Sequence, residues 1–228
     1  MTSSDPAAPG DPTGHVSPGG PAWILPVPGA VVRKFSVSDM DNNVYLLTCG
    51  ATSEHLLVDA ADDADRILAE LDLAGGGLGQ VVTTHRHWDH SRALEEVVRR
   101  TGARTLAGDA DADELPVPTG TRLTQGDTVH VGRLTLDVLA LRGHTPGSVA
   151  LALTVPDHPV VLLTGDSLFP GGPGRTGGAE DFASLMDALE ERVFAVYAAA
   201  PLVLPGHGDN TTLGAERPQL ARWRERGW

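Results

Sequence analysis

The chain has 228 residues, of which 41% are hydrophobic and 21% are charged, as in ordinary soluble globular proteins. This length is enough for one domain with a sizeable core. Thirty acidic residues against 17 basic ones give a formal net charge of −13, which repels phosphate backbones and argues against a nucleic-acid partner.

Two further features bear on the cellular location. The single cysteine, Cys49, excludes a disulfide within the chain and is expected to be buried. No apolar run is long enough to span a membrane, and the N-terminus lacks the basic start and apolar stretch of a signal peptide. We therefore expect a cytoplasmic protein with a small-molecule partner and no membrane contact. The sequence gives no signal for an oligomeric state.

Residues 1–21 are rich in Pro, Gly, Ser and Asp, and they predict a disordered tail before a single domain of residues 22–228. Strand-like runs then alternate with turn residues, which predicts an antiparallel meander. These runs are residues 31–37, 43–49 and 55–59. Asp62 can cap a following helix, whose apolar residues recur at spacings of three and four until residues 75–77, which are all glycine.

The remaining elements alternate in type along the chain. A strand at residues 78–84 precedes a helix that Ser91 caps and Gly102 ends, and the acidic residues 109–114 predict a solvated loop. Further strands are expected at residues 104–107, 128–131, 134–141, 148–155, 160–164 and 202–204, and helices at 182–193 and 211–226.

Residues 84–90 read Thr-His-Arg-His-Trp-Asp-His and lie between a predicted strand and a predicted helix. His85 and His87 are two apart, so on extended backbone their side chains leave on the same side, while Asp89 and His90 come from the turn. Neutral imidazole and carboxylate oxygen are the ligands that suit zinc and its neighbours. The alternative is a polar loop in which histidines happen to cluster.

Three later residues follow a common pattern of an apolar run, a glycine and a metal-competent side chain: His144, Asp166 and His207. Glycine permits the sharp backbone change that turns a ligand across the end of a sheet. Taken singly, His144 also fits a turn histidine and Asp166 a helix or turn cap. Taken together with the first cluster, the seven residues exceed the three that one catalytic zinc needs, so two metals are predicted.

The motif His-x-His-x-Asp-His at 85–90, followed in order by His144, Asp166 and His207, resembles the metallo-β-lactamase superfamily from about residue 31 to the C-terminus. The resemblance implies a four-layer αβ/βα sandwich with two mixed β-sheets and helices outside. It also implies two divalent cations, zinc first, with iron and manganese as alternatives. The first cation would be held by His85, His87 and His144, the second by Asp89, His90 and His207, with Asp166 bridging both.

Residues 84–90 and 204–216 together resemble the hydroxyacylglutathione hydrolases, or glyoxalase II-type enzymes. Because only one helix's worth of chain follows His207, the resemblance is to a short single-domain form. It implies hydrolysis of a thioester, such as a 2-hydroxyacyl (lactoyl) thiol conjugate, by a hydroxide that bridges the metals and is oriented by Asp89. Arg175 is a candidate contact for a substrate anion, and an exposed or structural arginine is the alternative.

Three other functions remain open. One is a persulfide dioxygenase with a single iron at His85, His144 and Asp166, although retention of the other ligands favours hydrolysis. Another is a lactonase or esterase that uses the same hydroxide. The third is a catalytically silent scaffold, which loss of ligands would signal, and no ligand is missing.

Overall fold

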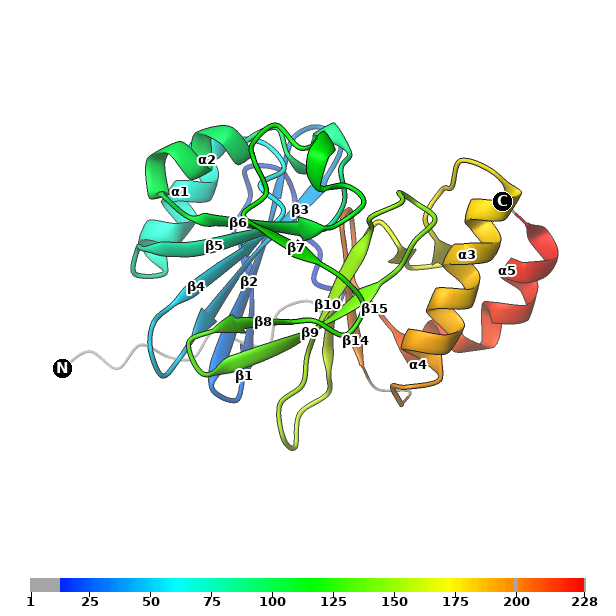
Figure 1. Cartoon of the computed structure of the whole chain (residues 1–228). Coiled ribbons are helices and arrows are strands. Elements are labelled where there is room, and N and C mark those ends of the chain that lie inside the picture. The colour runs from blue at the N-terminus through cyan, green and yellow to red at the C-terminus, as the bar shows by residue number, and fades with distance from the viewer. Residues whose placement is uncertain (1–12, 199–200, 228) are drawn as a thin grey trace.

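Two mixed β-sheets lie face to face in the computed structural model, which describes residues 13–198 and 201–227 (Figure 1). Over these residues the first sheet has seven strands in sequence order, antiparallel from β1 to β4 and parallel from β4 to β7. Its strands are β1 (Trp23–Val27), β2 (Ala30–Val37), β3 (Asn42–Cys49), β4 (His55–Val58), β5 (Leu78–Thr83), β6 (Arg104–Gly108) and β7 (Thr121–Leu123).

The second sheet has six strands over the same residues, in the order β15-β14-β11-β10-β9-β8. Only β11 and β14 pair in parallel. Its strands are β8 (Thr128–Val131), β9 (Leu134–Ala140), β10 (Val149–Leu153), β11 (Val161–Gly165), β14 (Leu202–Pro205) and β15 (Thr211–Thr212). A small separate hairpin joins β12 (Leu168–Phe169) and β13 (Gly172–Pro173).

The main core fills the space between the sheets, where Val32 and Leu47 of the first sheet pack with Leu136 and Leu151 of the second. The alternation of buried and exposed residues along β8 and the start of β9 places every second side chain in this core. Sheet-on-sheet packing of this kind leaves the outer face of each sheet to be covered by helices.

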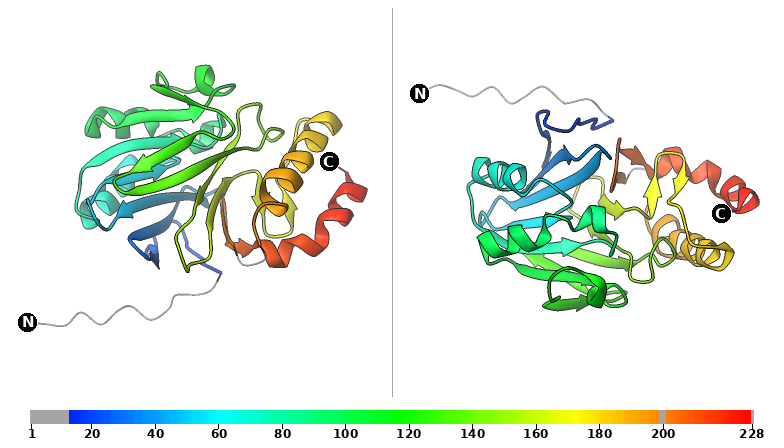
Figure 2. Two further views of the ribbon diagram at one scale, coloured as in Figure 1. Left: turned by 60° about the horizontal axis from the view of Figure 1, so that its bottom comes forward. Right: turned by 90° about the horizontal axis from the view of Figure 1, so that it is seen from above.

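Helices cover both outer faces, one group on each sheet (Figure 2). α1 (Ala64–Leu73) and α2 (Leu94–Thr101) lie on the first sheet, and α3 (Ala179–Leu189) and α5 (Leu220–Arg226) lie on the second, with short α4 (Leu213–Glu216) before α5. The predicted four-layer sandwich is confirmed. Among the described residues, no helix combines the length and the apolar character that crossing a bilayer requires.

The structure differs from the predicted tail over residues 13–21. Val16 is buried, Pro18 forms a β-bridge with Ser36, and the carbonyl of Thr13 accepts a hydrogen bond of 2.7 Å from the amide of Asn210. Sequence composition missed this segment because several of its contacts are made by backbone groups, which any residue supplies, and the others involve single side chains such as Val16 and His15. Residues 1–12 lie outside the described residues.

Candidate metal centre

Four strand ends deliver the predicted ligands to one edge of the sandwich. The turn at residues 84–90 follows β5, and the later ligands follow β9, β11 and β14. At Gly206, a β-carbon would lie 2.1 Å from a carboxylate oxygen of Asp166, so only glycine lets β14 end this close to the neighbouring ligand. The backbone of Asn43 donates to the Gly206 carbonyl at 2.7 Å and ties the two sheets together at this edge.

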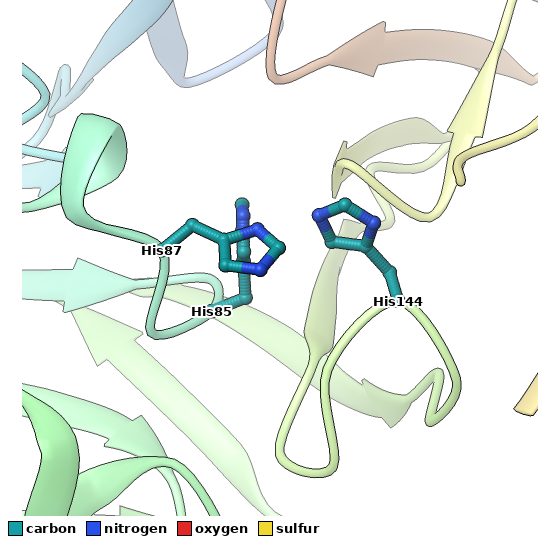
Figure 3. A group of neighbouring side chains, drawn as sticks. All are labelled: His85, His87 and His144. Atoms are coloured by element: carbon teal, nitrogen blue, oxygen red, sulfur yellow. The ribbon is translucent and has the colours of Figure 1, made fainter. Parts of the chain in front are cut away.

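His85, His87 and His144 form the first ligand group. Their ring centroids are 4.5–4.8 Å apart, and one nitrogen from each ring lies within 4.8 Å of the other two. In Figure 3 the rings of His85 and His87, which come from the turn after β5, face the ring of His144. His144 comes from the loop between β9 and β10. This is the number and type of ligands that a catalytic zinc takes from protein.

Two of these histidines are anchored through Nδ1. The Thr84 hydroxyl donates its one hydrogen to Asp59, at 2.8 Å, so its oxygen accepts from Nδ1 of His85 at 3.0 Å. Nδ1 of His144 donates to the carbonyl of Arg175 at 2.6 Å. The Nε2 atoms of both rings are buried and have no hydrogen-bond partner among the described residues. An anchored Nδ1 and an unpaired Nε2 fit a metal ion at Nε2.

Asp89, His90 and His207 form the second ligand group. Nδ1 of His90 contacts the Asp59 carboxylate at 2.9 Å, and Nδ1 of His207 donates to the carbonyl of Met40 at 2.8 Å. The two Nε2 atoms point to each other across 3.1 Å, and that of His207 lies 3.3 Å from Asp89 Oδ2. These imidazoles are therefore held in the same way as the first group.

Asp166 lies between the two groups. Its Oδ1 is 3.4 Å from Nε2 of His90, and its Oδ2 is 3.4 Å from Nε2 of His207 and 3.6 Å from Nε2 of His144. One carboxylate thus contacts histidines of both groups, and all seven predicted ligands come together.

The two groups carry different charges. Burial lowers the pKa of His85 well below its ordinary value, with a further contribution from nearby His90, and burial also lowers the pKa of His87. Burial would lower the pKa of His90 as well, but the carboxylates of Asp59 and Asp166 outweigh it and raise this pKa to about 10. Hydrogen bonds that His207 donates to Asp166 and Asp89 likewise overcome burial and raise the pKa of His207 to about 10.

The sequence pattern of the Metallo-beta-lactamase superfamily matches residues 37–207, a span that begins at the end of β2 and ends on the last ligand. The chain belongs to the metallo-β-lactamase superfamily.

Three proteins illustrate how much of the chain is similar to known sequences and structures. A protein named hydroxyacylglutathione hydrolase from Jannaschia sp. is 37% identical over 135 residues, which are 59% of this chain and 51% of that protein. A second one, from Cereibacter sphaeroides, is 35% identical over 73% of this chain and 62% of its own length. The chain therefore spans only about half to three fifths of these relatives. The solved structure of ETHE1 from Myxococcus xanthus has a TM-score of 0.73 and 30% identity, covering 85% of this chain and 86% of that one.

Three other side chains, those of Arg175, Trp88 and Phe169, differ in exposure and in what they contact. Arg175 is exposed, and its side chain lines a hollow together with Phe182 and Arg226. Trp88 is 59% exposed, with the Arg92 guanidinium stacked 3.8 Å from the ring centroid. The ring of Phe169 lies 6.4 Å from that of His207.

The polar residues whose hydrogen bonds position the candidate metal ligands were not predicted from the sequence. Asp59 accepts from the amide of Thr84 at 2.7 Å as well as from its hydroxyl, and Asn42 donates to Asp89 Oδ2 at 3.0 Å. For Asp59 a signal existed, because it directly follows the apolar strand β4, whose carboxyl end lies beside that of β5. Asn42 lies in a run of turn residues that looks like any other turn.

Proposed function

We propose that this chain is a hydrolase that binds two divalent cations and cleaves thioesters of small thiols. The observation that carries the proposal is the Asp166 carboxylate, which lies within 3.6 Å of histidines from both ligand groups. A shared carboxylate between two complete ligand groups is what a two-metal site requires. The similarity to proteins named hydroxyacylglutathione hydrolase supports the thioester as substrate class.

In this proposal the three histidines of the first group would hold one cation, the second group would hold the other, and Asp166 would contact both. When bound, the cations supply Lewis acidity and lower the pKa of water, so that hydroxide is available near neutral pH. Imidazole and carboxylate ligands fit zinc, iron or manganese, with zinc as the first choice.

Asp89 is the proposed catalytic residue. Burial would raise the pKa of its carboxyl group, but hydrogen bonding to His207 and the nearby charge of His90 outweigh burial and lower it, so the group stays ionised and accepts hydrogen bonds. Asn42 donates to the carbonyl and to Oδ2 of Asp89, at 3.1 and 3.0 Å, and so fixes the orientation of the carboxylate. In that position Asp89 orients the attacking water towards the carbonyl carbon of the thioester.

The sulfur of the substrate leaves as a thiolate when the carbon–sulfur bond breaks. A thiol has a pKa of about 8.5, so it departs without a strong acid and the site needs no separate proton donor. Arg175 is the proposed contact for an anionic group of the thiol carrier, because the residue is exposed and its backbone carbonyl accepts a hydrogen bond from His144.

The test begins with metal content per chain after purification without added metal, followed by hydrolysis of lactoyl thioesters of several thiols. About two zinc ions and thioester cleavage are expected, and the His87→Ala variant is expected to lose both activity and one metal. His130→Ala is the matched control, because His130 is an exposed histidine on β8. One iron per chain with oxygen uptake on a thiol persulfide, and no thioester cleavage, would refute the proposal in favour of a dioxygenase.

A further inference from the structure

Asp111 is a fully buried carboxylate in a loop that the sequence predicted to be solvated. It follows β6, and the other acidic residues of the loop, Asp109, Asp113 and Glu114, are exposed, as predicted. The prediction is wrong at this one position, because composition does not tell which acid of a run turns inward. A buried carboxylate requires several donors to stabilise it, and Asp111 has them.

The oxygens of Asp111 accept three hydrogen bonds from two other segments. The amide of Arg86 donates at 2.9 Å, the amide of Gly147 donates at 2.8 Å, and the hydroxyl of Thr145 donates to the same oxygen as Arg86. Arg86 stands between His85 and His87, and Thr145 directly follows His144. One carboxylate therefore joins the two segments that carry the first ligand group.

The contact leaves no room for the segments to slide. A β-carbon on Gly147 would lie 2.4 Å from the backbone nitrogen of Asp111, and one on Gly108 would lie 1.9 Å from the carbonyl oxygen of Gly147. The turn itself is closed by the Ser148 hydroxyl, which lies 2.6 Å from that of Thr145 and accepts from its amide at 3.1 Å. The position of His144 relative to the other two histidines is thus set in large part at Asp111, together with the backbone hydrogen bond of 2.9 Å from the amide of Val149 to the carbonyl of Thr84.

A carboxylate suits this place better than an amide of the same shape. All three of its partners are donors, and an ionised carboxyl group only accepts, with lone pairs on both oxygens. An asparagine would turn its own NH₂ towards at least one of these donors. The guanidinium of Arg86, with Nε 3.8 Å from Asp111 Oδ1, adds charge of the right sign.

We propose that Asp111 is a positioning residue that fixes His144 against the His85–His87 pair and thereby sets metal affinity at the first ligand group. It contacts no residue of the second group, whose histidine His90 is held by Asp59 instead. The inference rests on the metal binding proposed above, but it needs no particular substrate.

The experiment compares Asp111→Asn in two backgrounds, each retaining one complete ligand group. In His207→Ala only the first group is complete, and in His87→Ala only the second. Zinc affinity is measured on the metal-free proteins by competition with a chromophoric chelator. We expect Asp111→Asn to weaken binding 10- to 100-fold in the first background, as loss of a residue supporting a metal ligand does, and less than about 3-fold in the second. Asp113→Asn, an exposed change in the same loop, is the matched control with no effect in either.

Thr145→Val provides a second variant, which removes the hydroxyl that bonds Asp111 and Ser148 and keeps the side-chain volume. It is expected to give a smaller loss confined to the first group, and it decides the matter if Asp111→Asn does not fold. Cobalt absorption spectra of the same proteins should shift only where the first group is complete. Equal weakening of both groups, or no weakening in either variant, would overturn the proposal. Absence of metal binding by the unaltered chain would instead overturn the proposed function.

Discussion

The two ligand groups differ in the charge that surrounds their histidines. The first group consists of three imidazoles, whereas the second combines two imidazoles with the Asp89 carboxylate. His85, His144 and His207 are anchored by a hydroxyl or a backbone carbonyl, which are neutral. His90 is instead anchored by the Asp59 carboxylate. Burial lowers the pKa of His85, whereas nearby carboxylates raise those of His90 and His207 to about 10. Without metal, the first group is neutral, and the Nε2 atoms of His90 and His207, 3.1 Å apart, share one proton.

The largest effect is expected where the two groups meet. Asp166→Asn keeps the shape of the side chain and removes the charge that both groups share. We expect loss of at least one metal and a fall in kcat/KM of about a thousandfold, because several kcal/mol of charge stabilisation depend on the paired cations. Metal analysis and thioester kinetics measure both effects. Asp157→Asn, an exposed turn position, is the control, and two bound metals with near-normal kcat/KM in Asp166→Asn would contradict the shared role.

Asp59→Ala breaks the anchor of the second group. It leaves His90 and both the amide and hydroxyl of Thr84 without their buried acceptor. Removing one partner of a buried ion pair costs about 3–5 kcal/mol, so urea unfolding of the metal-free protein should show a loss of this size. A loss below about 1 kcal/mol would mean that Asp59 contributes little and that the contrast between the groups has another origin.

The clustering of the seven candidate ligands was predictable from sequence, whereas the residues that hold them mostly were not. His85, His87 and His90 form a local motif, and Asp166 and His207 each follow an apolar run and a glycine, so short windows contain the signal. The partners of Asp111 lie 25, 34 and 36 residues away, and no local pattern records such a contact.

The fold, like the site, was predictable from sequence only in part. Individual strands and helices followed from apolar periodicity and turn residues, as in β9 and α3, whereas their arrangement in two sheets with helices outside came from the resemblance to the superfamily. The short strands β1 and β7 were missed, because five and three residues at or near a sheet edge carry little periodic signal and their pairing is decided by the neighbouring strand.

The pH dependence of metal binding sharpens the comparison. Histidines with a raised pKa stabilise the metal-free protein fully below about pH 6.5, and this contribution is lost as pH rises through about 10. In between, a metal at the second group must displace the proton that His90 and His207 share, so its affinity should rise about tenfold per pH unit. The lowered pKa values of His85 and His87 predict little change at the first group above pH 6.5.

Calorimetry in buffers of different ionisation enthalpy counts the protons directly. The His87→Ala protein, in which only the second group is complete, should release about one proton per zinc at pH 7.5. The His207→Ala protein should release fewer. Equal proton release from the two would show that the groups do not differ in charge, whatever their affinities.

Lys34→Met should give the smallest effect and tests the support of the His207 loop. The Lys34 ammonium is buried and donates to the carbonyls of Gly14 and Gly208 and to Oδ1 of Asn210, at 2.9, 2.7 and 2.8 Å. Burial lowers its pKa to about 8, although Asp209 opposes this. Methionine leaves three acceptors unpaired, which should cost about 1–3 kcal/mol at pH 7.

The pH profile of this variant separates the charge of Lys34 from its packing. The unfolded chain binds the lysine proton up to about pH 10.5 and the folded chain only up to about 8, so this residue's contribution to stability rises between those values. The contributions of His90 and His207 to stability fall with pH over part of that range. Both proteins contain these histidines, so their contributions cancel when the stability of Lys34→Met is subtracted from that of the unaltered protein. Urea unfolding of both metal-free proteins at pH 7, 8, 9 and 10 should show their stabilities diverging as pH rises. Parallel profiles would mean that Lys34 keeps its ordinary pKa although its ammonium is buried.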